Sequence, residues 1–198
     1  MNDELKKIQK DVARFHQKVA STVTPLYPGI ELCYLTFSTD SFSVRHNAIS
    51  HIIQINYCKA GQIMWEMKNG NRIYLNPGDF SLHTMKACTD SVLTFPNNMY
   101  QGLTIYIDLQ EASDNPPELL KSSDIFETVL PEKYCRDDSP AFLAGNEQTE
   151  SIFSAFYNQP EMLMLPYQKI KILELLLYLS KMEFTPQNKL TEYHFELT

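Results

Sequence analysis

The sequence lacks a hydrophobic run that could cross a membrane. Its longest apolar stretch, around residues 173–179, is far shorter than the ~20 residues that a membrane-spanning helix needs. The N-terminus, starting at Met1, carries charges with no apolar segment behind them, so a secretory signal is not expected. These absences predict a cytoplasmic protein with no membrane partner.

Cysteine is scarce, and no Cys-x-x-Cys pair occurs. A structural zinc site would need Cys and His at ligand spacing, and no such cluster is visible. In a reducing compartment the simplest interpretation is a set of buried thiols, with redox sensing by one of them left open. The four cysteines are Cys33, Cys58, Cys88 and Cys135.

Positive charge is in deficit. Lys and Arg number 17 against 24 Asp and Glu, which gives a formal net charge of −7. A free-standing nucleic-acid-binding domain usually shows the opposite balance. With 198 residues, 43% of them hydrophobic, the chain has the size and composition of one folded domain.

The segment 30–110 shows the pattern of short β-strands separated by turns. Asn69-Gly70 is a strong hairpin signal, because a type I′ turn needs positive φ at both central positions. Seven short strands at this spacing predict an antiparallel sandwich or barrel. The expected strands cover residues 31–37, 50–58, 62–68, 72–75, 80–84, 91–95 and 103–109.

Alternation of apolar and polar residues gives each strand two distinct faces. We expect the apolar face of each strand to point into the barrel. By the same reasoning, the apolar residues of 103–109 are predicted to point inward. Gln54 and Asn56 then fall on the outer face. This inner face would suit a ligand cavity, although a closed core would show the same pattern. The residues predicted to line the cavity are Ile53, Ile55, Tyr57, Trp65 and Met67.

Helical spacing appears at both ends of the chain. Apolar residues at 5, 8, 12, 15 and 19 predict an amphipathic N-terminal helix, and those at 152, 153, 156 and 157 predict another. After Pro166, a helix through 170–179 is apolar around most of its circumference, so it needs cover from another helix or a second subunit. We expect a homodimer with an interface at Ile170, Leu173, Leu176 and Leu177.

The turn Pro77-Gly78-Asp79, followed by His83, resembles the second half of the cupin signature. Metal-binding cupins supply a His-x-His pair and a Glu in the first half, and this sequence has no His-x-His. Fewer than three convergent ligands hold a catalytic metal poorly. We therefore expect no metal and no other cofactor. We interpret His83 as a sheet histidine and include it among the residues predicted to bind the ligand.

Three runs together resemble the sensor domain of AraC-type transcriptional regulators: residues 51–61, 75–79 and 95–103. The resemblance implies an α+β fold, a cupin-like antiparallel β-barrel followed by C-terminal helices. It also implies binding of a small-molecule effector, dimerisation, and DNA contact only through a helix-turn-helix domain that we do not find in this sequence. The implied segments are an N-terminal helix and loop (1–29), the barrel (30–110) and a helical dimerisation and linker region (111–198).

Two other functions stay open from the sequence. One is a small metal-dependent cupin enzyme, and the other is a cupin-like domain that only dimerises. The scattered histidines and the lack of a nucleophile-elbow motif identify no catalytic residue. We therefore expect a binding module rather than an enzyme.

Overall fold

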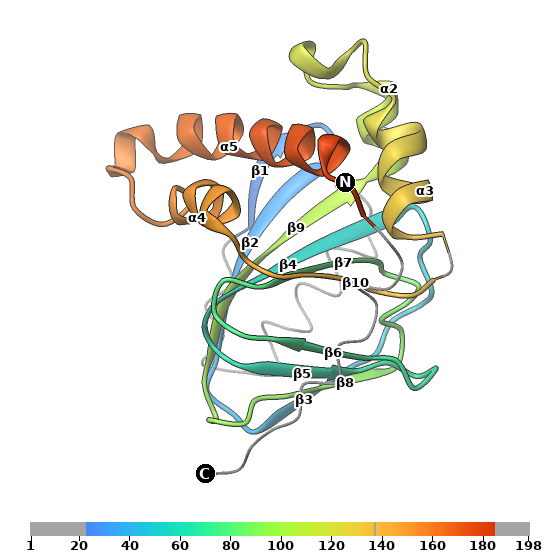
Figure 1. Cartoon of the computed structure of the whole chain (residues 1–198), viewed down its shortest axis with the longest axis vertical. Coiled ribbons are helices and arrows are strands. Elements are labelled where there is room, and N and C mark those ends of the chain that lie inside the picture. Colours follow the sequence, from blue (N-terminus) through green and yellow to red (C-terminus); the bar gives the residue numbers. More distant parts are fainter. Residues whose placement is uncertain (1–22, 137, 185–198) are drawn as a thin grey trace.

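The computed structural model describes residues 23–136 and 138–184, in which two antiparallel sheets face each other as a barrel (Figure 1). The six-stranded sheet has the order β1 (Val23–Tyr27), β2 (Ile30–Phe37), β9 (Tyr100–Asp108), β4 (Ile52–Gly61), β7 (Phe80–Thr84) and β10 (Ala141–Leu143). The four-stranded sheet has the order β3 (Ser41–Val44), β8 (Ser91–Thr94), β5 (Ile63–Glu66) and β6 (Arg72–Leu75).

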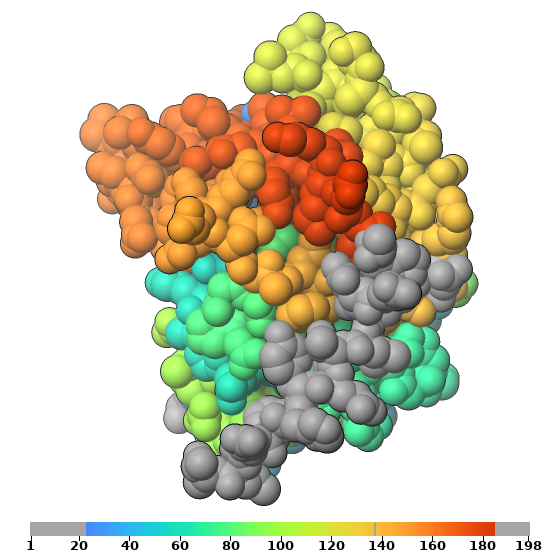
Figure 2. All heavy atoms as spheres, viewed as in Figure 1, coloured from blue at the N-terminus to red at the C-terminus, as the bar shows by residue number. Residues whose placement is uncertain are grey.

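Helices cover the outer face of the six-stranded sheet (Figures 1 and 2). Side chains cap two of them: Asp108 accepts from the first amides of α2, and Asn146 forms a capping box with Thr149 in α4. No helix within the described ranges is both long and apolar enough to cross a membrane. The helical elements are α2 (Leu109–Asp114), η1 (Glu118–Leu120), η2 (Ile125–Val129), α3 (Leu130–Tyr134), α4 (Glu147–Ser154) and α5 (Glu161–Lys181).

The largest apolar core lies between the six-stranded sheet and the helices, outside the barrel. Ile53, Ile55 and Tyr57 belong to this outer core, and the Tyr57 ring stacks on Phe153 of α4 with 4.1 Å between centroids. Their predicted inward placement is therefore wrong. The alternation correctly separated the two faces of β4, but the helices bury the more apolar face on the outside.

The apolar residues of β9 follow the same rule. Leu103, Ile105 and Ile107 face the helices, while Thr104 and Tyr106 line the barrel interior. A second, smaller core between the sheets contains Trp65 and Met67, whose inward placement is confirmed.

All seven predicted strands are present, and the α+β fold class is confirmed. Two further strands fall in segments predicted to be loop or helical: β1 pairs with β2, and β10 pairs with β7. β3 is a third strand that was not predicted, and β4 continues to Gly61 through a bulge near Cys58, where a turn was expected. The helix expected over residues 5–19 and the tail 185–198 lie outside the described residues.

Helix α5 begins at Glu161 and runs through Pro166, whereas the sequence predicted a start after this proline. A proline inside a helix leaves an earlier carbonyl without its amide partner. Here most of the surrounding turn, residues 161–167, is exposed, so water can satisfy that carbonyl.

Two of the four predicted interface residues are buried within their own chain. Leu176 is fully buried and Leu173 is 8% exposed, because this side of α5 packs on the sheet. Neither can form a dimer interface, and that part of the prediction is wrong. Ile170 and Leu177 remain exposed.

A candidate ligand cavity inside the barrel

A cavity lies between the two sheets. Its volume is about 60 Å³, which is enough for a few water molecules. None of the described residues that line it is Asp, Glu, Lys or Arg. The lining residues are Leu35, Phe37, Phe42, Val44, His46, Gln54, Asn56, Ile63, Trp65, Cys88, Leu93, Tyr100, Thr104 and Tyr106.

A chain of hydrogen bonds crosses the floor of the cavity. The Thr104 hydroxyl donates to Oδ1 of Asn56 at 2.8 Å, and Nδ2 of Asn56 then donates to Nε2 of His83 at 3.1 Å. The other ring nitrogen of His83 donates to the carbonyl of Thr84 at 3.1 Å. Each partner fixes the next, so the network assigns His83 as the neutral tautomer with its proton on Nδ1.

Burial also keeps His83 uncharged. It lowers the pKa of the imidazole from 6.5 to about 4, which outweighs the opposing effect of the bond to Thr84. The His83 and Trp65 rings are nearly perpendicular, at 87°, with 4.7 Å between centroids. His83 therefore stands behind the wall and supports Asn56 and Trp65, which face the cavity.

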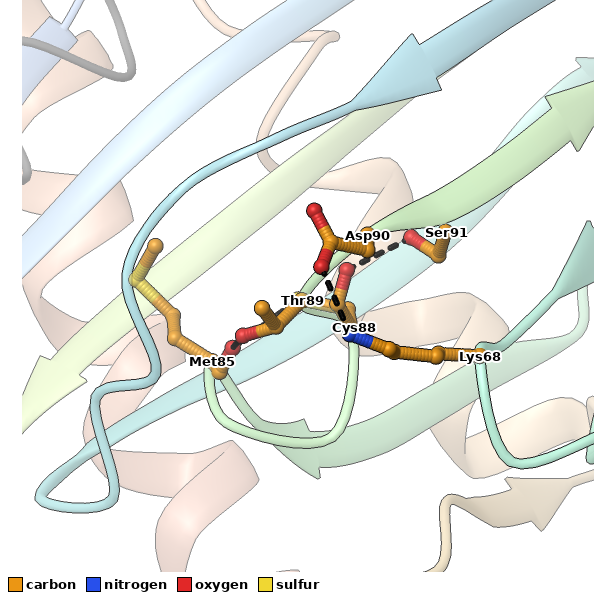
Figure 3. Close-up of polar contacts among 6 residues, drawn as sticks. All are labelled: Lys68, Met85, Cys88, Thr89, Asp90 and Ser91. Atoms are coloured by element: carbon orange, nitrogen blue, oxygen red, sulfur yellow. Dashed lines mark hydrogen bonds and ion pairs between the residues drawn. The ribbon is translucent and has the colours of Figure 1, made fainter.

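Cys88, in the loop of residues 85–90, lines the cavity. Figure 3 shows the polar contacts of this loop. The Thr89 hydroxyl donates to the carbonyl of Met85 at 3.1 Å, and the Ser91 hydroxyl donates to the carbonyl of Cys88 at 2.6 Å. Ser91 also accepts from the Trp65 indole at 2.7 Å, so the loop and the Trp65 side chain hold each other in place. An ion pair of 3.0 Å between Lys68 and Asp90 connects the loop to the turn that follows β5 (Figure 3).

Cys88 and His46 meet at the cavity wall. Nδ1 of His46 donates to the carbonyl of Asn47 at 2.7 Å, which leaves Nε2 facing the Cys88 sulfur at 3.5 Å. Burial raises the pKa of Cys88 to about 12, so its sulfur is a thiol rather than a reactive thiolate at neutral pH.

Of the residues predicted to bind ligand, Trp65 alone lines the cavity. Met67 packs in the core between the sheets, and His83 lies behind Asn56. Ile53, Ile55 and Tyr57 are on the opposite face of β4.

The sequence reasoning missed the polar wall, namely Gln54, Asn56, Thr104 and Tyr106. The sequence does contain a signal for this wall, because these polar residues alternate with apolar ones on β4 and β9. A polar strand face usually points to solvent, however, and the alternation alone therefore predicts an outward orientation.

The cupin resemblance raises the question of a metal. Nε2 of His83 is occupied by Asn56, and no group of three His, Cys, Asp or Glu side chains converges anywhere in the part of the chain that the structure describes. These residues do not fit a cupin metal centre.

No family model matches the sequence, and no curated protein does. Among solved structures, the chain is similar to unsaturated fatty acid-bound ToxT from Vibrio cholerae strain SCE256, with a TM-score of 0.51 at 8% identity. The match covers 75% of this chain and 53% of ToxT, so the chain spans about half the length of that protein. It shows a shared fold.

Two further matches have lower TM-scores. Another ToxT structure from Vibrio cholerae matches with a TM-score of 0.49 at 10% identity, covering 79% of this chain and 60% of that one. A Cupin 2 conserved barrel domain protein from Salinispora arenicola CNS-205 matches with a TM-score of 0.39 at 12% identity. That match covers 50% of this chain and 83% of the other.

Proposed function

We propose that this chain is the effector-binding and dimerisation part of a transcriptional regulator of the AraC type, and not an enzyme. The observation that carries the proposal is the apolar cavity between the sheets, which resembles a small-molecule site in having a largely apolar wall with a few polar groups. The motifs in residues 51–61, 75–79 and 95–103 and the fold shared with ToxT, an AraC-family regulator, support it. DNA contact would come from a domain outside this sequence.

The two faces of β4 and β9 offer a route from the cavity to the helices. Asn56 faces the cavity, and the next residue, Tyr57, stacks on Phe153 of α4. A shift of β4 on ligand binding would therefore move α4 without any intervening element. Because packed side chains deform little, a small displacement would be passed on rather than absorbed.

We also propose that two copies associate through the exposed side of α5. Leu163, Ile170 and Leu177 are exposed and lie seven residues apart, so they form one apolar stripe along the helix. A stripe of this spacing fits against a second copy of itself across a two-fold axis.

Binding can be tested by screening small molecules against the purified chain. We expect a ligand that raises the melting temperature and also changes the emission of Trp65, the sole tryptophan, which lines the cavity. A stabilising ligand that leaves Trp65 emission unchanged would argue against the cavity as the binding site. About one equivalent of metal that survives dialysis against a chelator would instead favour the metal-dependent enzyme.

A further inference from the structure

Two buried polar side chains in the cavity wall have no hydrogen-bond partner among the described residues. Gln54 is 6% exposed and Tyr106 is 7% exposed, and both line the cavity. They lie directly opposite each other on β4 and β9, so their side chains emerge side by side on the inner face of the sheet. Neither bonds to the other.

Their neighbours in the same wall are hydrogen-bonded. Asn56 and Thr104 form the next inward pair along the two strands; the Thr104 hydroxyl donates to Asn56, and Asn56 donates to His83. Buried polar groups in proteins are nearly always hydrogen-bonded, since an unpaired one is costly. The side chains of Gln54 and Tyr106 are thus available to hydrogen-bond to a molecule bound in the cavity.

Their chemistry specifies the complementary group. The Gln54 amide offers two donors and one acceptor, and Tyr106 offers a hydroxyl. Burial raises the pKa of Tyr106 well above its usual range, so this group keeps its proton and can donate. Two donors can converge on one carbonyl oxygen, which has two lone pairs.

An anionic ligand would not suit this site. No Lys or Arg is among the described residues of the wall, and the residue opposite Tyr106 on β2 is an acid, Glu31. A carboxylate would enter a largely apolar space that has no permanent cation among its described lining residues, which is unfavourable.

We propose that the cavity binds a small, uncharged and largely apolar molecule whose carbonyl or hydroxyl oxygen is hydrogen-bonded by Gln54 and Tyr106. This inference rests on the proposed function, since it specifies the ligand of the same cavity. The aromatic and aliphatic wall, including Phe37, Phe42 and Leu93, would hold the remainder of the molecule.

Two probes of equal size separate neutral from anionic ligands. Methyl butyl ketone and pentanoate would be titrated into the full chain at neutral pH, with Trp65 emission and ligand-detected NMR as readouts. We expect the ketone to bind at least about tenfold more tightly than the carboxylate. Equal or tighter binding of pentanoate, with Trp65 responding, would overturn the ligand class while leaving the cavity as the binding site. If neither probe binds, this inference fails, while the proposed function stands or falls separately with the ligand screen described above.

Variants test the two residues. Tyr106→Phe and Gln54→Leu should each weaken ketone binding by about threefold to tenfold. Neither variant should lower the melting temperature of the free protein, because the lost hydroxyl or amide has no hydrogen-bond partner among the residues that the structure describes. If the two residues had a purely structural role, the variants would instead lower the melting temperature and leave ketone binding unchanged.

Matched controls come from the helical layer. Tyr134 donates to the carbonyl of Leu179, and Gln168 donates to the Tyr34 hydroxyl, both outside the cavity. Tyr134→Phe and Gln168→Leu should lower stability and leave the ketone affinity within about twofold. If the cavity variants bind the ketone as tightly as these controls do, the assignment of Gln54 and Tyr106 is wrong.

Discussion

At the scale of single residues, the hydrogen bonds around His83 favour its neutral state. A proton on Nε2 would face the Nδ2 amide of Asn56, so two donors would point at each other. Relieving that contact by turning the amide would remove the acceptor of the Thr104 hydroxyl. Protonation of one ring would therefore disturb the floor of the cavity.

This arrangement predicts a pH-dependent stability. Folding lowers the pKa of His83 from 6.5 to about 4, so between these values the unfolded chain binds a proton that the native chain excludes. The free energy of unfolding should rise with pH across this window, by about 3 kcal/mol from this group, and level off above it. Urea unfolding of the wild type and of His83→Gln at a series of pH values measures the difference. A variant as pH-sensitive as the wild type would contradict the assignment.

At the scale of elements, the strands could be predicted from the sequence because their signals are local. Alternation and turn residues such as Asn69-Gly70 act over a few positions. β1 was missed because Pro25 reads as a break, yet β1 is an edge strand, where a proline is tolerated. β10 was missed because it has only three residues.

The direction of each face could not be predicted from the sequence. Both faces of the six-stranded sheet are covered, one by helices and one by the other sheet, so every residue of β4 from 52 to 58 is buried. Alternation distinguishes two faces but does not say which cover each receives. The candidate site was therefore placed on Ile53 and Ile55 instead of Gln54 and Asn56.

A matched pair of conservative variants tests this corrected orientation. Ile55 lies in the outer core and Ile63 in the cavity wall, and both are buried. Ile55→Val and Ile63→Val should each lower the free energy of unfolding by about 0.5–1.5 kcal/mol. Only Ile63→Val should change the affinity for a cavity ligand, measured by Trp65 emission. An equal change for Ile55→Val would return this residue to the ligand site.

At the scale of the whole molecule, one sheet serves two cores. The six-stranded sheet supplies the inner wall of the cavity and also the surface on which α4 and α5 pack. Tyr34 of β2 reinforces that packing, because its hydroxyl donates to the carbonyl of Phe156 and accepts from Gln168 of α5. A ligand between the sheets and a partner on α5, as proposed, would therefore act on opposite sides of the same strands.

The exposed stripe on α5 predicts the state of association. Leu163, Ile170 and Leu177 are 47%, 60% and 52% exposed, so covering each contributes about half of the roughly 1.5–3 kcal/mol gained by burying a whole leucine side chain. Three from each copy could offset the lower end of the entropic cost of association, about 4 kcal/mol.

Ile170→Glu or Leu177→Glu should yield a folded monomer by light scattering, with unchanged circular dichroism. Leu119→Glu, at an exposed leucine on η1, should leave the dimer intact. The negative charge of the chain opposes association only weakly, since salt screens it at physiological strength, so a wild type that is monomeric at high micromolar concentration would refute the interface.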